Sequence, residues 1–198
     1  MKEMSHSSMN RCRKYWSSTL LSAAIAALLL FVSALHAAEL TNELSSEYVE
    51  ISSVEAHFKP AKGMTRSERF EGFEAPDRNV EVVVALIRSP FDGIAQNFTK
   101  ETLGTRGVDV LSRSEIAING RRGVLVKALH PDAEVNWGKW ILILENGDAT
   151  LLANGVFVSG DDSASIDVEA MLKGVVAYGE KRPASSPDVQ AVNEEVGN

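Results

Sequence analysis

Cysteine is almost absent from this chain of 198 residues, because Cys12 is the only one. Cys12 lies in an N-terminal segment that has the features of a secretory signal, so the exported chain would contain no cysteine. A disulfide framework is thereby excluded, although export would permit one. An ordinary hydrophobic core must stabilise the remaining chain, whose length of about 160 residues suits one domain.

The sequence also lacks the short motifs that carry chemistry. It has no G-x-G-x-x-G, no phosphate-binding loop and no serine in a G-x-S-x-G context. Beyond residue 37 the only histidines are His57 and His130, which do not form an i, i+4 pair for zinc. Asp161-Asp162 lacks the alternating acidic loop of a calcium site and is interpreted as helix capping. We therefore expect no enzyme, and no catalytic, cofactor or metal site.

Charge is missing from Tyr15 to Ala38, a stretch rich in leucine and alanine that follows a basic start. A basic region, an apolar region and small residues at its end are the parts of a cleaved secretory signal. We expect cleavage near Ala37 or Ala38, with Ala34 as a further candidate. The alternative is an uncleaved anchor, since a membrane-spanning helix needs about 20 apolar residues.

Basic residues are in the minority, with 20 Lys+Arg against 27 Asp+Glu. Residues 1–37 contain four of the basic residues and one of the acidic residues, which leaves 16 against 26 in the exported chain. Nucleic acid is therefore not an expected partner, because its binding depends on Lys and Arg that neutralise phosphates. The exported chain is expected to have no stable membrane anchor and to be periplasmic or extracellular.

Four segments follow from these patterns. Residues 1–37 are predicted to be the signal peptide, and 38–47 a flexible N-terminus of the mature chain. Residues 48–179 are predicted to form a single α+β domain. Residues 180–198 have two prolines, scattered charge and no periodicity, which indicates a disordered tail.

Strands and two helical regions are predicted within the domain. Apolar residues occupy both parities from Val80 to Ile87, as expected of a strand covered on both faces. Ser89-Pro90 then begins a helical region. The spacing of Val168, Met171, Leu172 and Val175 predicts a closing amphipathic helix, which Gly179 would end.

Two hairpins are predicted at Asn-Gly dipeptides. At Asn119-Gly120, a two-residue loop would set Ile116 and Ile118 beside arginine and glycine, and the buried pattern favours a three-residue loop instead. The adjacent Arg121 and Arg122 should point to opposite faces, which indicates a turn rather than an anion site.

The second hairpin is predicted to turn at Asn146-Gly147 and to pair Leu144 with Ala149, and Trp140 with Ala153. One of its faces is wholly apolar and must be buried. The other face is mixed and is the predicted surface for a protein partner, because an exposed tryptophan can anchor one. That surface consists of Trp137, Lys139, Ile141, Leu152 and Val156.

The order of these segments resembles a known family. SERFEGFEAP, the apolar strand, TKETLGTRGVDVL, INGRRGVLV, KWILILENGDATLLANGVF and the closing helix are together similar to small exported bacterial proteins of the PsbP-like (DcrB-like) fold. The resemblance spans residues 48–178. It implies an α+β class with a curved, mainly antiparallel sheet and helices on both faces, an α/β/α sandwich. Relatives include an extrinsic photosystem subunit and a nuclear Ran-binding factor, and none implies an active site.

Three functions remain open from the sequence. The leading hypothesis is an exported, non-catalytic protein that binds a protein partner or assists an envelope complex. The alternative is a carrier of a small ligand or lipid, with a pocket between sheet and helices. A hydrolase using a carboxylate pair is the third, and two close, desolvated carboxylates would favour it.

Overall fold

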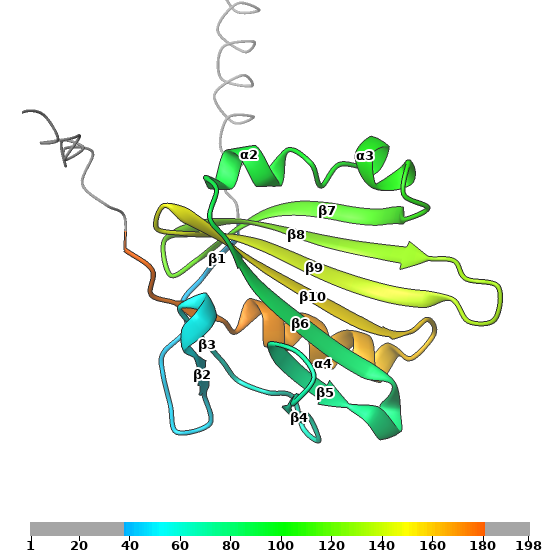
Figure 1. Cartoon of the computed structure of the whole chain (residues 1–198), viewed down its shortest axis with the longest axis horizontal. Coiled ribbons are helices and arrows are strands. Elements are labelled where there is room, and N and C mark those ends of the chain that lie inside the picture. Colours follow the sequence, from blue (N-terminus) through cyan, green and yellow to red (C-terminus); the bar gives the residue numbers. More distant parts are fainter. Residues whose placement is uncertain (1–37, 181–198) are drawn as a thin grey trace, which may run out of the picture. The chain divides into compact units, whose positions relative to one another are not determined.

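The structure is a computed structural model that describes residues 38–180 of the chain (Figure 1). The predicted signal peptide, with its cleavage site after Ala37, and the predicted tail beyond Glu180 lie outside the described residues. Strands dominate this unit, with a curved, mixed eight-stranded sheet in the order β1-β7-β8-β9-β10-β6-β5-β4. Its strands are β1 Ala38–Leu40, β4 Thr65–Arg66, β5 Gly72–Ala75, β6 Val80–Ile87, β7 Asp109–Ile118, β8 Arg121–His130, β9 Trp137–Asn146 and β10 Ala149–Val158.

A second, three-stranded sheet and a few helices complete the described part. The small sheet has the order β11-β3-β2. Its strands are β2 Val49–Ile51, β3 Ala56–Phe58 and β11 Val176–Ala177. The helices are α2 Phe91–Ala95, α3 Lys100–Gly104 and α4 Asp162–Lys173, with 3-10 turns η2 Ser52–Val54 and η3 Pro76–Arg78. None of the helices in residues 38–180 has the length and apolar character needed to cross a lipid bilayer.

The first hairpin corrects the predicted loop length. Ile118 pairs with Arg121 and Ile116 with Gly123, so Asn119 and Gly120 form a two-residue loop. Both loop residues have positive φ, 49° and 73°, as a type I′ turn requires. The buried pattern could not select the register, because β8 is apolar on both faces.

The second hairpin is shifted by two residues from the predicted register. Leu144 pairs with Leu151, so the loop is Gly147-Asp148 and Asn146 belongs to β9. A shift of two residues keeps every side chain on its predicted face. Asn146 is 1% exposed, and its side chain binds backbone groups of two distant segments, which removes it from the turn.

The apolar face of the hairpins forms the main core. Trp140, Leu142, Leu144 and Leu151 are buried there, and α4 packs against β9 and β10. Trp140 is 7% exposed, and its indole Nε1 donates a hydrogen bond to the Ser165 hydroxyl on α4 at 3.0 Å. The predicted burial of this face is confirmed.

A second cluster lies on the opposite face of the same strands. Val126 of β8 and Ile141 and Ile143 of β9 are buried in it, together with Phe91 of α2 and Leu103 of α3. The helical region expected after Pro90 consists of two short helices, and Thr99 caps the second one by accepting from the Thr102 N–H at 3.2 Å.

Strand β6 is covered on one face only, which corrects the prediction of a doubly buried strand. Val80, Val82 and Val84 are buried in the main core, whereas Val83 and Ala85 on the other face are exposed. Helices α2 and α3 pack against β7, β9 and β10. This face of β6 is therefore left to solvent.

Helix α4 begins where the sequence predicts and ends earlier. The Asp161 carboxylate accepts from the Ala164 N–H at 2.8 Å, which confirms the capping interpretation of Asp161-Asp162. The helix ends at Lys173, with Gly174 as its C-cap. Gly179 does not close it, because the chain after Val175 forms strand β11 in the small sheet.

The start of the described chain is part of the sheet, where a flexible terminus over 38–47 was expected. Strand β1 pairs in parallel with β7, with Ala38 beside Ile116 and Leu40 beside Ile118. The Asn42 amide donates to the Lys173 and Val175 carbonyls at 2.8 and 3.2 Å. Asn42 N–H also donates to the Asn119 side chain at 2.7 Å, which fastens this segment to the first turn.

Replacing Trp140 with alanine should lower the free energy of unfolding by about 3–5 kcal/mol, because it empties a packed site in the core. Urea denaturation followed by circular dichroism measures the change. Trp137→Ala, at a partly exposed position, is the matched control and should lose clearly less. Equal losses from the two variants would contradict the burial described for the apolar face.

Replacing Asn42 with alanine should lower the free energy of unfolding by about 1–3 kcal/mol, because two carbonyls lose their donor. Thr41→Ala is the control, since Thr41 is exposed and is the immediate neighbour. Denaturation midpoints measured under one set of conditions give the comparison. If neither variant differs from the unchanged protein, the segment 38–47 does not contribute to the fold.

Candidate functional site

The structure divides the predicted partner surface into two parts. Trp137, Lys139 and Val156 line one pocket of about 510 Å³ on the mixed face. Ile141 is only 7% exposed and Leu152 is half-buried, and both pack in the cluster beneath α2 and α3. The first three residues and their exposed neighbours on β6, Glu81 and Val83, are called the open face below.

Strand register explains why these side chains meet. Lys139 of β9 lies directly opposite Val156 of β10, which in turn lies opposite Glu81 of β6. On the other side of β9, Trp137 pairs with His130, the last residue of β8. Residues that are directly opposite in an antiparallel pair share a face. The pocket therefore extends over β8, β9, β10 and β6, at the end of the sheet where β9 begins.

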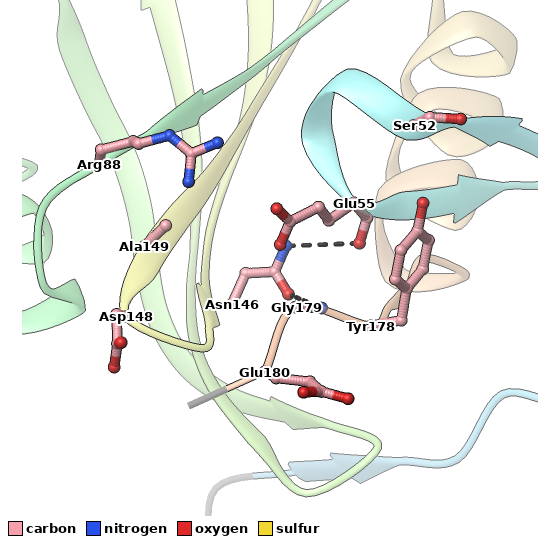
Figure 2. Close-up of a pocket in the computed structure, with 9 residues that line it drawn as sticks. All are labelled: Ser52, Glu55, Arg88, Asn146, Asp148, Ala149, Tyr178, Gly179 and Glu180. Atoms are coloured by element: carbon pink, nitrogen blue, oxygen red, sulfur yellow. Dashed lines mark hydrogen bonds between the residues drawn. The ribbon is translucent and has the colours of Figure 1, made fainter. Parts of the chain in front are cut away.

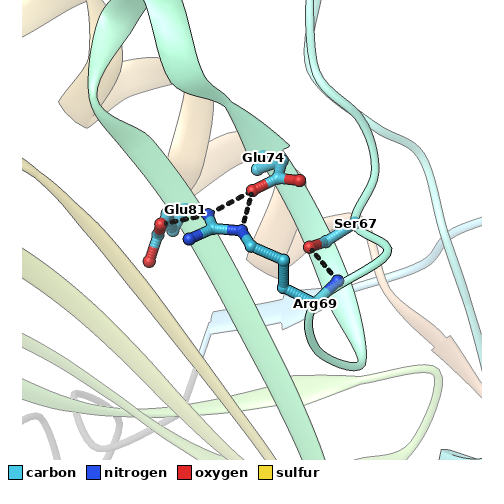
Figure 3. A network of polar contacts seen from close by, with 4 residues as sticks. All are labelled: Ser67, Arg69, Glu74 and Glu81. Carbon is cyan, nitrogen blue, oxygen red and sulfur yellow. Dashed lines mark hydrogen bonds and ion pairs between the residues drawn. The ribbon is translucent and has the colours of Figure 1, made fainter.

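Arg69 and Glu81, which line this pocket, form a polar network with Ser67 and Glu74 (Figure 3). The Arg69 guanidinium, from the loop between β4 and β5, binds Glu74 of β5 and also Glu81 of β6, the latter at 2.7 Å. The Arg69 N–H donates to the Ser67 hydroxyl at 3.1 Å. The guanidinium lowers the pKa of the Glu74 carboxyl, and its bonds to Glu74 and Glu81 hold Arg69 across two strands.

Several polar groups at this face have no partner within the described residues. His130 Nδ1 and Asn154 Oδ1 are buried atoms without a hydrogen bond. The Lys139 ammonium forms no ion pair or hydrogen bond with any residue from 38 to 180. Most buried polar atoms in proteins are hydrogen-bonded, so these two buried atoms distinguish this part of the sheet.

A second pocket, of about 590 Å³, lies near the end of the second hairpin (Figure 2). Its centre is the Asn146 side chain, whose amide donates to the Val54 carbonyl at 3.1 Å and accepts from the Gly179 N–H at 2.7 Å. These groups satisfy one another and join β9 to η2 and to the chain after β11. Although this pocket is slightly larger, its central polar residue is already bonded within the fold, so we select the open face as the candidate site.

The two neighbouring arginines have separate partners, as their adjacent strand positions predicted. Arg121 donates to the Gly179 carbonyl at 3.0 Å. Arg122 binds Asp92 and Glu145, and its guanidinium lies 4.9 Å from the centre of the Phe91 ring. Both therefore connect elements of the fold and do not form one anion site.

Metal and acid–base chemistry find little support among residues 38–180. No group of three or more His, Cys, Asp or Glu side chains in this range is placed to hold a metal ion. His57 contacts the Tyr178 ring in the small sheet, with 5.3 Å between the ring centres. The carboxyl pKa values that are shifted in this range, at Glu50, Glu74 and Glu101, are all lowered, whereas a general acid needs a raised one.

Sequence reasoning missed His130 and the Arg69 network. His130 is the last residue of β8 and pairs with Trp137. The pairing of His130 with Trp137 could be predicted only from the register of β8 against β9. The sequence between these two strands has no turn dipeptide that fixes that register. Arg69 lies 12 residues from Glu81 in the chain, and only the pairing of β5 with β6 brings them together.

No protein-family model matches the chain, and no curated protein matches its sequence. Two solved structures are similar in fold. Cyanobacterial PsbP (CyanoP) from Synechocystis has 11% identity and a TM-score of 0.49, over 69% of this chain and 98% of that one. A protein of unknown function from Pseudomonas aeruginosa has 18% identity and a TM-score of 0.41, over 48% of this chain and 69% of that one.

Proposed function

We propose that the protein is exported, is not an enzyme, and binds a protein partner through the open face. One observation carries this proposal: Trp137, Lys139 and Val156 lie together on a part of the sheet that none of the helices in residues 38–180 covers, beside buried polar atoms that have no partner in the same range. Tryptophan is one of the residue types enriched among binding hot spots.

The physical basis of the proposal is the unequal covering of the mixed face. Helices α2 and α3 bury Ile141 and Ile143, whereas Val83 and Trp137 on the same face remain accessible to solvent. A partner that covers the open face would bury the Trp137 ring and supply an acceptor to the Lys139 ammonium. Complementary polar groups of this kind set the orientation of a complex more than its affinity.

The alternative functions make different demands on the same residues. A carrier of a small ligand or lipid would need the pocket at Trp137 to enclose its cargo, and its lining includes the charged side chains of Arg69, Glu81 and Lys139. A hydrolase with a carboxylate pair would need one carboxyl with a raised pKa. The lowered pKa of Glu74, beside Glu81, favours a structural ion pair.

We also propose that the described unit is a three-layer α/β/α sandwich. Support comes from α4, which packs on the Leu142 face, and from α2 and α3, which pack on the Ile141 face. The short lengths of α2 and α3 would leave the outer layer incomplete, and the open face is the part that they do not reach.

Export is proposed from the sequence of residues 1–38, with cleavage near Ala37 or Ala38. Strand β1 begins at Ala38, so a cut at either position leaves the mature chain starting within or directly at this strand. N-terminal sequencing of the protein from the periplasm or the medium should give a first residue of Ala38 or Glu39. Exported protein that begins at Met1, or protein that is found only in the membrane fraction, would contradict this.

Partner binding is tested by capture and titration. The exported protein is used to capture partners from the exporting cell, and the identified partner is then titrated by calorimetry. Trp137→Ala should weaken binding by about 2 kcal/mol or more, because truncating a buried aromatic anchor has this cost. Ile166→Ala, which removes a side chain 65% exposed on α4, is the matched control and should leave the affinity unchanged.

The outcomes separate the partner-binding protein from the carrier. An affinity that is the same for Trp137→Ala and for Ile166→Ala would reject the open face as the binding surface. A small molecule that copurifies with the unchanged protein and is lost from Trp137→Ala would favour the carrier.

A further inference from the structure

Strand β7 is an edge strand whose outer side is paired over only part of its length. In the described residues its outer neighbour is β1, which covers β7 from Ile116 to Ile118. From Asp109 to Glu115 the strand pairs with β8 alone, and nearly all of these residues are exposed. Leu111 is the largest apolar side chain among them and is 55% exposed.

The free part of this edge presents backbone groups that can form a ladder. The Asn119 N–H donates to the Leu40 carbonyl at 2.8 Å, which shows that Asn119 directs its backbone groups toward β1. Backbone groups alternate in direction along an antiparallel strand, so Arg113 and Glu115 also point outward. Strand β1 begins beside Ile116, so its ladder reaches no further along β7 than the Glu115 carbonyl. Such a row is a template for an added strand.

An apolar groove lies beside the free edge. It has a volume of about 490 Å³ and runs between α2 and the strands β7 and β8, with Phe91, Ala95 and Val124 in its lining. Arg113 and Glu115 form its rim on the edge strand. A strand added about 4.8 Å from β7 would place alternate side chains on the same face as this rim. One of these side chains could then enter the groove.

A second copy of this chain is a poor occupant. Antiparallel pairing of two β7 edges over the whole free range would set Asp109 of each copy opposite Glu115 of the other, and like charges directly opposite are destabilising. A shifted register would set Arg113 of each copy opposite Glu115 of the other. In that register the β7 strand of the second copy would collide with β1, which already pairs with β7 at Ile116.

We propose that the β7 edge from Asp109 to Glu115 is a strand-addition site for an extended segment of a partner protein. The segment would carry an apolar side chain for the groove and a basic residue that meets the Glu115 carboxylate, whose side chain is 76% exposed. The Arg113 guanidinium is less available, because it donates to the Phe98 carbonyl at 3.2 Å. This inference deepens the proposed function and rests on it, since it names the form of the partner.

The test uses a display library of random decapeptides, selected on the purified exported protein. Selected peptides should alternate apolar and polar residues and contain Lys or Arg. Binding should protect the Arg113 and Glu115 amides from hydrogen exchange. Glu115→Pro removes one outward N–H and should weaken binding about tenfold or more, because main-chain bonds supply the affinity of an added strand. Glu115→Ala keeps the N–H and, as the loss of a rim charge, should stay within about fivefold.

Two further results decide the outcome. Glu115→Pro should keep the thermal midpoint of the unchanged protein to within a few degrees, since proline is tolerated where an edge N–H faces solvent. If the Glu115→Pro variant unfolds instead, the proposal is decided by whether peptide binding protects the Arg113 and Glu115 amides of the unchanged protein from hydrogen exchange. A selection that yields no binder, or binders that leave these amides unprotected, would overturn the proposal. Binders that depend on Trp137 and ignore Glu115→Pro would overturn this inference and leave the proposed function intact.

Discussion

Burial of strands β8 and β9 on both faces is the constraint on which the rest of the structure depends. Leu142 and Leu144 of β9 point into the core beneath α4, while Ile141 and Ile143 point into the cluster beneath α2 and α3. A strand that is apolar on both sides needs cover on both sides. The positions of all three helices follow from this requirement, and the open face begins where the cover ends.

The sequence was sufficient to predict which face of each hairpin strand is buried. It was insufficient to predict the register in which the strands pair. The parity of Trp140 and Leu142 assigned the buried face correctly, because alternation along a strand is a local property. In the first hairpin, Asn119-Gly120 follows its local turn preference. In the second, the Asn146 side chain is bound to Val54 and Gly179, distant in sequence, so the loop moves to the next two residues. Hydrogen bonds to residues distant in the sequence outweigh the local turn preference at this position. The local sequence pattern therefore could not predict where the loop lies.

The candidate site was predictable to the same extent. Trp137, Lys139 and Val156 were found from strand parity, and the structure brings these three together. Ile141 and Leu152 have the same parity but lie beneath the helices, and helix placement could not be derived from the hairpin alone. The doubly apolar sequence of β6 was misleading for a related reason. Within residues 38–180, Val83 on its second face remains exposed.

Strand β1 joins the eight-stranded sheet across a longer stretch of chain than the other pairs of that sheet, from Ala38 to Ile116. The meander from β7 to β10 is built from neighbouring hairpins, so it can form early at a small cost in chain entropy. Closing the long loop to β1 is slower, and this strand has only three residues to hold it. In the order of folding, β1 therefore docks late, and in the native protein it is among the first elements to open. Each opening would lengthen the free edge of β7 by the residues that β1 had covered.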